Sequence, residues 1–191
     1  MSLLMAVSSS PRRNGNTELL LNSFVEGVKT QGWEAEIYRI HYLNIGMCQA
    51  CDFCAKEGEC ILDDDMQYIY SRIKEAQGLV VASPVYFGTV SGQFKIFIDR
   101  FQCWWQAKYR LKSPFVSEEE GKKGFFICVS ALTNKNYCAN AAEVAKVLFH
   151  NLNYRYIDSL SFEGFDFKGS IKEHPDALEK AFESGKKFAS K

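Results

Sequence analysis

The chain has 191 residues, of which 23 are Lys or Arg and 23 are Asp or Glu, so its formal net charge is zero. This balance gives no overall field toward nucleic acid or a membrane surface, and no apolar run approaches the length of a membrane-spanning helix. The 15 Phe, 9 Tyr and 3 Trp exclude a disordered chain, since disordered segments are poor in aromatic residues. The length suits one domain with a sizeable core.

The amino-terminal segment does not have the order of a secretory signal. Its apolar stretch, 1–7, is shorter than the apolar core of a signal, and Arg12 and Arg13 follow it rather than precede it. We therefore expect a cytoplasmic protein, in a compartment where thiols stay reduced. Seven cysteines, an odd number, then favour a metal or cluster site over structural disulfides.

Apolar runs and apolar residues at helical spacing alternate along the chain. In chain order they predict a strand at 3–8, a helix between 16 and 32, a strand at 34–40, a helix after the acidic run 63–65, a strand at 78–83, a long helix at 92–109, a loop at 113–124, a strand at 125–130, a helix at 141–152, a strand at 154–161 and a helix at 175–188. Strands that alternate with helices need crossover connections, which predict a parallel sheet covered on both faces. The fold class is therefore α/β, with five strands in a doubly wound sheet.

Three of the predicted strands end in small polar residues. These are 8–10 after the first strand, Ser83 and Pro84 after the third, and Ser130 after the fourth. In a doubly wound sheet, ligands bind beyond the carboxyl ends of the strands. We expect these ends to converge on one side of the sheet and to form a ligand site there.

The segment 8–17 joins the first predicted strand to the first predicted helix. Asn16 and Thr17 stand at the start of that helix, where unpaired N–H groups and the helix dipole attract an anion. Arg12 can add a bidentate partner for a phosphate. The residues interpreted as phosphate ligands are Ser8, Ser10, Arg12, Asn14, Asn16 and Thr17. From chemistry alone, a polar loop with an ordinary Asn or Thr helix cap explains the segment equally well.

Neither of the common nucleotide loops matches this segment. No Gly-Lys-Ser/Thr closes it, and it is not G-x-G-x-x-G, so nucleoside triphosphates and the usual NAD fold are disfavoured. Residues 9–17, S-S-P-R-R-N-G-N-T, resemble the phosphate loop G-S-P-R-x-x-G-N-T of the NADPH-dependent FMN reductase-like branch of flavodoxin-like proteins, with Ser9 in place of the usual Gly. Residues 83–100 are similar to the same family's stretch S-P-V-Y-x-x-x-x-S-x-x-x-K-x-x-x-D-R.

This resemblance implies a flavodoxin-like sheet of strand order 2-1-3-4-5, with FMN as cofactor and NAD(P)H as a possible substrate. It also implies that the loop after the third strand faces the isoalloxazine ring, through Pro84, Val85, Tyr86, Phe87 and Gly88. From the residues alone, the two aromatic side chains could instead cap the core at a sheet edge. A third flavin contact is expected at Ser130, with Ala131 and Asn134.

The remaining polar and aromatic residues of the long predicted helix are assigned no chemistry. Asp99 and Arg100 are interpreted as structural, in an intrahelical or helix-to-loop ion pair, and Trp104 and Trp105 are expected at a subunit interface or beside the flavin. The three His are scattered and no hydrolytic constellation is present, so no catalytic residue is predicted.

Four cysteines crowd into one short segment, with the spacing C-x2-C-x2-C-x5-C. They are Cys48, Cys51, Cys54 and Cys60. Four thiolates so placed can converge on one centre, and C-x2-C-x2-C is a spacing that wraps an iron–sulfur cluster. The last gap and Ile61 after it differ from the bacterial ferredoxin pattern. A tetrahedral zinc site and free redox-reactive thiols remain as alternatives. The other three, Cys103, Cys128 and Cys138, are expected to be small buried residues.

The cysteine spacing resembles that of iron–sulfur flavoproteins, the same flavodoxin-like group with a [4Fe-4S] cluster after the second strand. The resemblance implies one domain over 1–191 with a cysteine-rich insertion at about 44–64, and electron transfer between the cluster and FMN. It further implies a small-molecule or ferredoxin-like electron donor and a homodimer or homotetramer with the flavin near a subunit interface. Two alternatives stay open: a cluster-free NAD(P)H-dependent FMN or quinone reductase, and a non-catalytic flavin- or zinc-holding redox sensor.

Overall fold

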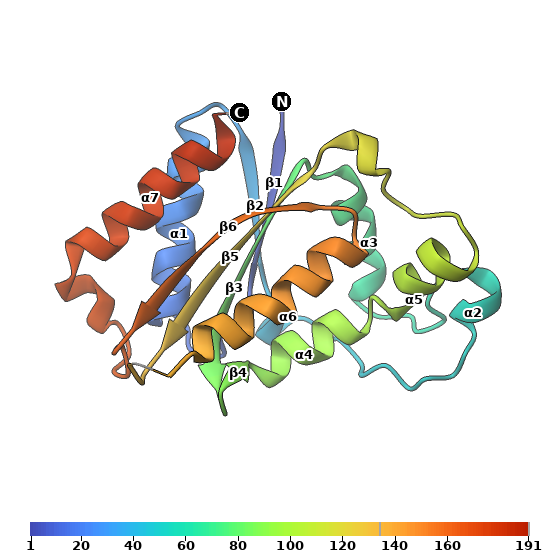
Figure 1. The fold of residues 1–191 in the computed structure, drawn as a ribbon, viewed down its shortest axis with the longest axis horizontal. Coiled ribbons are helices and arrows are strands. Elements are labelled where there is room, and N and C mark those ends of the chain that lie inside the picture. Colours follow the sequence, from blue (N-terminus) through green and yellow to red (C-terminus); the bar gives the residue numbers. More distant parts are fainter. Residues whose placement is uncertain (134, 191) are drawn as a thin grey trace.

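The protein, described by a computed structural model over residues 1–133 and 135–190, is built on one twisted sheet (Figure 1). The strands are β1 (Leu3–Ser8), β2 (Glu34–Arg39), β3 (Gly78–Tyr86), β4 (Thr89–Val90), β5 (Lys123–Ser130) and β6 (Arg155–Glu163). The order is β2-β1-β3-β5-β6 with every pair parallel, while β4 is a short antiparallel extension of β3. Without that extension, the order is the predicted 2-1-3-4-5, and the flavodoxin-like α/β fold is confirmed.

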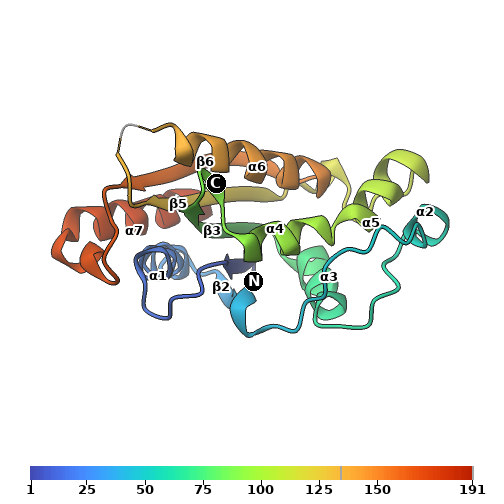
Figure 2. The same cartoon turned by 90° about the horizontal axis from the view of Figure 1, so that it is seen from below.

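Helices cover both faces of the sheet, as Figures 1 and 2 show. One face carries α1 (Asn16–Lys29) and α7 (Pro175–Ala189), and the other carries α3 (Met66–Glu75), α4 (Gly92–Asp99) and α6 (Tyr137–Asn151). The short helices α2 (Cys54–Glu57) and α5 (Gln102–Trp105) lie at one end of the molecule. Within the described residues, 3-10 helices lie at Ile40–Tyr42, Glu118–Glu120 and Ser170–Glu173, and a π-helical turn lies at Gln106–Arg110.

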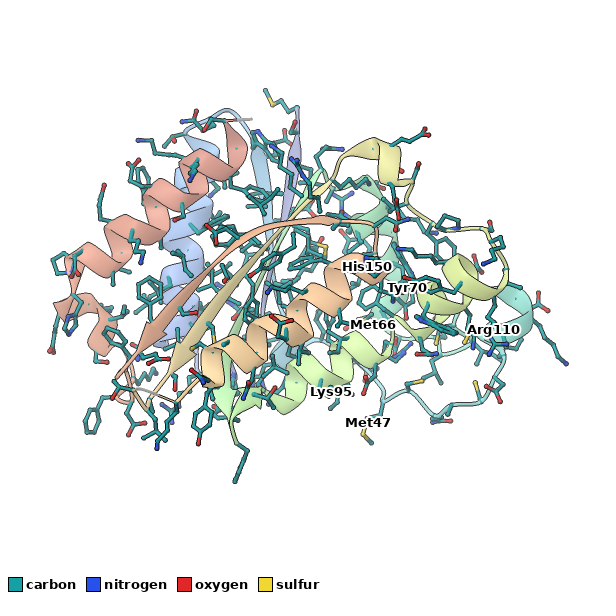
Figure 3. The ribbon with its side chains drawn as sticks, viewed as in Figure 1. Met47, Met66, Tyr70, Lys95, Arg110 and His150 are labelled. Atoms are coloured by element: carbon teal, nitrogen blue, oxygen red, sulfur yellow. The ribbon has the colours of Figure 1, made fainter. Side chains whose placement is uncertain are left out.

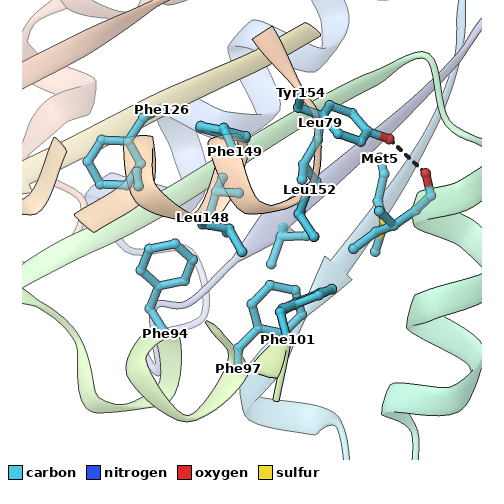
Figure 4. Packing of buried hydrophobic residues seen from close by; sticks show 14 of the residues in the cluster. Met5, Leu79, Phe94, Phe97, Phe101, Phe126, Leu148, Phe149, Leu152 and Tyr154 are labelled. Atoms are coloured by element: carbon cyan, nitrogen blue, oxygen red, sulfur yellow. Dashed lines mark hydrogen bonds between the residues drawn. The ribbon is translucent and has the colours of Figure 1, made fainter. Parts of the chain in front are cut away.

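Alternate strand residues divide the interior into two cores, because successive side chains of a strand point to opposite faces. On β1, Met5 and Val7 face α3 and α4, whereas Leu4 and Ala6 face α1 and α7. In the first core, aromatic residues of α4 and of the turn after it point toward β5 and α6 (Figure 4). This double burial explains why the central strands are continuous apolar runs in the sequence.

The two helices α1 and α7 approach each other at glycine. A Cβ atom added to Gly27 would lie 2.0 Å from the carbonyl oxygen of Phe182, and one added to Gly185 would lie 2.0 Å from that of Phe24. Backbone therefore packs on backbone at this crossing, which only glycine allows.

The prediction of one continuous helix at 92–109 is wrong. Helix α4 ends at Asp99, α5 begins at Gln102, and the chain then widens into the π-helical turn. The break turns the fully buried side chain of Arg100 toward the loop before α3, while Phe101 and Trp104 stay in the core. Trp104 packs on Phe101 and Phe115 inside its own chain, which corrects the expectation that it lies at an interface or beside the flavin.

Between β2 and α3 the chain follows an extended path whose regular structure is the 3-10 helix at Ile40–Tyr42 and the four-residue helix α2. Met47 of this segment is largely exposed and points away from the sheet (Figure 3). Among the described residues, none of the helices combines the length and the apolar character that a membrane crossing requires.

Candidate functional site

The loop between β1 and α1 ends at a helix start that no side chain caps. Gly15 is the N-cap residue, and the first intrahelical bond runs from the N–H of Leu19 to its carbonyl at 3.0 Å. The N–H groups of the first turn are therefore free for an anion. A Cβ on Gly15 would lie 2.9 Å from the carbonyl oxygen of Arg12, so the loop is as tight as its glycine permits.

A buried network of serines fixes this loop against the sheet. The hydroxyl of Ser91 donates to the carbonyl of Ser9, and its oxygen also lies 3.0 Å from the hydroxyl oxygen of Ser9. The N–H of Ser91 donates to the hydroxyl of Ser83 at 3.1 Å. The hydroxyl of Ser9 in turn donates to the carbonyl of Ala82 at 3.1 Å. Ser9, the position at which the loop departs from the family pattern, thus links the ends of two neighbouring strands.

The structure brings the loop after β1 and the loop after β3 together around a pocket of about 70 Å³. From the predicted set, its walls include Ser10, Arg12, Asn16, Thr17, Pro84, Val85 and Tyr86. Ser8 is instead buried at the end of β1 and does not line this pocket, and neither does Asn14. The N–H of Asn14 donates to the buried carboxylate of Glu18 at 2.5 Å, with Asn14 in the left-handed region at a φ of 55°.

Two of the predicted ligands have partners within the chain. The side-chain amide of Asn16 donates to the carbonyl of Phe167 at 2.9 Å and accepts from the N–H of Ile171 at 3.2 Å, so this side chain anchors the segment after β6. The guanidinium of Arg12 donates to the carbonyl of Asp166 at 3.1 Å. These contacts hold the segment after β6 against the phosphate loop.

That segment adds pocket residues which the sequence analysis missed. Phe165, Asp166 and Lys168 line the same pocket as the phosphate loop. The strand-end rule could have found them, because they follow the last strand at the same edge of the sheet. Lys168 gives the pocket a second cation besides Arg12.

A wider pocket of about 460 Å³ lies beside the first and shares Val85 and Ala131 with it. Phe87, Gly88, Ser130 and other residues complete its walls. Phe87 adopts a φ of 50° and its side chain is fully exposed, while a Cβ on Gly88 would crowd the ring of Tyr137 at 3.3 Å. The hydroxyl of Ser130 is buried and donates to the carbonyl of Leu132 at 2.9 Å. Asn134 lies outside the described residues.

The four clustered cysteines line one pocket of about 350 Å³ between their own loop and α5. Cys48 and Cys51 are exposed, and Cys54 and Cys60 are half-buried. Burial raises the pKa of Cys54 above its usual range. Within 1–133 and 135–190, no three His, Cys, Asp or Glu side chains stand close enough together to hold a single metal ion.

Cys103 is a fifth cysteine on the wall of this pocket. It is free and buried, as predicted, and so are Cys128 and Cys138. Burial raises the pKa of the Cys103 thiol to about 11. Its Sγ lies 3.3 Å from the carbonyl oxygen of Arg100.

The expected ion pairs of Asp99 and Arg100 both form, each with a different partner. Asp99 pairs with Lys95 one turn earlier in α4, and Arg100 pairs with Asp64 in the loop before α3. Burial opposes the ionisation of Asp64, but hydrogen bonds from Arg100 and from the N–H groups of Gly46 and Met66 outweigh it and lower its pKa. Asp64 therefore also binds the first N–H of α3, the helix that follows its acidic run.

The cysteine pocket and the phosphate pocket are separate. Among the described residues, none lines both of them. The segments that form them lie at different ends of the molecule, α2 and α5 at one side of Figure 1 and the tips of β5 and β6 at the other.

Comparison with known proteins gives a family match and a set of relatives. A family model described as NADPH-dependent FMN reductase matches residues 2–164. An iron–sulfur flavoprotein of Methanocaldococcus jannaschii is 38% identical over 97 residues, which are 51% of this chain and 50% of the relative. One of Methanosarcina thermophila is 33% identical over 110 residues, 58% of each chain. The chain thus spans about half the length of these iron–sulfur flavoproteins.

Other matches cover nearly the whole chain at lower identity. A putative NAD(P)H-dependent FMN-containing oxidoreductase of Bacillus subtilis is 26% identical over 88% of this chain and 82% of its own. Among solved structures, an NAD(P)H:quinone oxidoreductase from Methanothermobacter marburgensis has a TM-score of 0.70 at 16% identity, covering 97% of this chain and 96% of that one. At this identity the likeness shows the fold alone.

Proposed function

Because this chain belongs to the NADPH-dependent FMN reductase family, we propose that it is a flavin-dependent oxidoreductase that holds FMN together with a [4Fe-4S] cluster. The observation that carries the second half of the proposal is the pocket lined by all four clustered cysteines. When bound, FMN supplies one- and two-electron redox chemistry and the cluster supplies one-electron transfer. The chain's own contribution is to hold, orient and bury these groups.

The residues around the phosphate loop fit FMN. The uncapped first turn of α1 offers N–H donors, and Arg12 and Lys168 supply positive charge beside the hydroxyls of Ser10 and Thr17. The adjoining wider pocket gives room for a ring system next to the backbone of 84–88. An anion pocket beside a wider pocket matches the two ends of FMN, its phosphate and its planar ring.

The cysteine pocket fits a cluster better than a single zinc ion. Thiolate ligands stand about 2.3 Å from Zn²⁺, so a zinc site is closed tightly around one atom. The pocket of about 350 Å³ that these thiols help to line has room for a group of several atoms. The similarity of about half of the chain to iron–sulfur flavoproteins supports the same assignment.

We further propose that the chain works as a homodimer or homotetramer with a ferredoxin-like or NAD(P)H electron donor. Phe87 supports an interface at the flavin, since its ring is fully exposed and lines the wider pocket. A light-scattering mass of one chain, unchanged by FMN, would contradict this part of the proposal.

Metal and flavin analysis tests the function directly. Protein purified without oxygen should contain about one FMN, and about four iron and four acid-labile sulfide per chain if the cluster is present. Flavin without iron would overturn the cluster and leave the second candidate, an NAD(P)H-dependent FMN or quinone reductase, which the nearly full-length relative of Bacillus subtilis favours. Anaerobic mixing with NADPH and with reduced ferredoxin then identifies the donor; if neither bleaches the flavin absorbance, the oxidoreductase assignment fails.

A further inference from the structure

Arg100 places a fully buried positive charge on the wall of the cysteine pocket. Burial of a guanidinium costs free energy unless its N–H groups have hydrogen-bond partners. The partners of Arg100 therefore show what holds this charge in place. Nη1 donates to the carbonyl of Gly46 at 2.9 Å and to the carboxylate of Asp64. That carboxylate is itself held by the N–H groups of Gly46 and Met66, at 2.9 and 3.0 Å. The guanidinium is thus fixed in place by the loop that carries the cysteines.

The other terminal nitrogen of Arg100 points to sulfur. Nη2 lies 3.4 Å from Sγ of Cys60, within hydrogen-bond distance for a sulfur acceptor. Nε is buried without a hydrogen-bond partner among the described residues, so the side chain still has a donor to give. A guanidinium has only donors, and Cys60 can accept well only as a thiolate.

The backbone of the same residue binds a different cysteine. Cys103 donates to the Arg100 carbonyl at 3.3 Å, and the hydroxyl of Tyr70 donates to that carbonyl at 2.6 Å. Cys103 is thereby engaged as a thiol, whereas Cys60 faces a cation. Arg100 therefore presents a different group to each cysteine. Its charged guanidinium faces Cys60, and its neutral carbonyl faces Cys103.

We propose that Arg100 hydrogen-bonds Cys60 as a ligand of the cluster and makes the cluster easier to reduce, while Cys103 is not a ligand. This inference rests on the proposed function, since it concerns the same pocket. Hydrogen bonds to ligand sulfurs and nearby charge set the reduction potential of iron–sulfur clusters. A donor that carries a full positive charge favours the reduced, more negative state.

The first test replaces the donor and keeps the fold. The double variant Arg100→Gln with Asp64→Asn makes both members of the buried ion pair neutral, so neither charge is left unpaired. The single variant Arg100→Lys keeps the positive charge but lacks the planar guanidinium. The matched control is Lys95→Gln, which removes an exposed cation from the preceding turn of the same helix. Iron and sulfide content is measured first, and the cluster potential is then followed by electron paramagnetic resonance in an anaerobic redox titration.

We expect the double variant to keep its iron and to lower the equilibrium constant for one-electron reduction at least tenfold, a shift of about 59 mV to more negative potential. Arg100→Lys should fall between this variant and the wild type, and Lys95→Gln should match the wild type. Equal reduction potentials in the double variant and the control would overturn the proposed role of Arg100 and leave the proposed function standing. Wild-type protein that binds no iron would overturn the proposed function and this inference with it.

A second pair of variants tests ligand identity if the Arg100 variants fail to fold. Cys60→Ser should lose iron, whereas Cys103→Ser should keep the full content, because a serine hydroxyl can still donate to the Arg100 carbonyl. The reverse pattern, with iron lost only from Cys103→Ser, would overturn the assignment.

Discussion

Replacing Gly185 by alanine should destabilise the protein, although it sits within helix α7. Helix propensity alone predicts a gain of about 1 kcal/mol for a glycine-to-alanine change in a helix interior. The structure predicts the opposite sign. The new Cβ would lie 2.0 Å from the carbonyl oxygen of Phe24 and 3.1 Å from the backbone nitrogen of Val28, so α1 and α7 must move apart by at least about 1 Å.

The cost of that movement comes from the packing around the crossing. Phe24 packs on Phe188 with ring centroids 5.6 Å apart, and both belong to the core beneath the two helices. Overpacking a close contact costs about 1–3 kcal/mol, and here the obstructing atom is backbone, which has no rotamer to change. Because the obstructing atom is backbone, we expect a packing cost in the upper part of that range. After the propensity gain of about 1 kcal/mol is subtracted, the net loss of stability should be about 1–2 kcal/mol.

Urea unfolding followed by circular dichroism measures this difference, since the midpoint moves when stability changes at constant slope. The matched control is Gly92→Ala in the first turn of α4, where an added Cβ meets nothing within 4 Å. It should leave stability unchanged or raise it by about 0.4–1 kcal/mol. A Gly185→Ala protein as stable as the control would refute the close backbone contact.

Three further predictions concern the sites. Lys168→Gln should weaken FMN retention at unchanged unfolding free energy, whereas Lys172→Gln, outside the pocket, should not; equal loss in ultrafiltration assays would contradict the placement of the phosphate. In metal-free protein, Cys48 should be alkylated at neutral pH well before the buried Cys103, whose reaction should accelerate as pH nears about 11; peptide mass spectrometry follows both. The pKa of Asp64 is lowered in the folded state, so its contribution to stability is complete above the ordinary value of 3.8 and is lost as pH falls below it. Asp64→Asn should therefore cost about 3 kcal/mol at neutral pH and show a flatter decline in acid, which a pH series of urea midpoints would reveal.

The sheet and the meeting of the loops after β1 and β3 could be predicted because their signals are local. Continuous apolar strands, the start of the first helix and the residues at strand ends are each predicted from a few neighbouring positions. Lys168 was missed because the sixth strand continues to Glu163, beyond its predicted end, and carries the following loop to the pocket. The break after Asp99 was missed because apolar spacing in 92–109 remains compatible with one helix.

The sequence indicated a structural ion pair for Arg100, but neither its partner nor its contact with Cys60 could be predicted. Its partner Asp64 lies 36 residues earlier, and its neighbour Cys60 lies 40 residues earlier, so only the tertiary fold brings the three together. Ser9 is a comparable case. In the sequence, Ser9 is only a departure from the Gly of the family's phosphate loop. In the structure, its hydroxyl links Ser91 to the carbonyl of Ala82.

The separation of the two pockets has a consequence for biosynthesis. The cysteine-rich segment leaves the sheet after β2 and returns at α3, and it supplies no strand to either core. On the proposed function, a cell short of iron should therefore still produce a folded chain that takes up flavin, with the cluster inserted afterwards. Iron supply would then limit only the second of the two proposed redox centres.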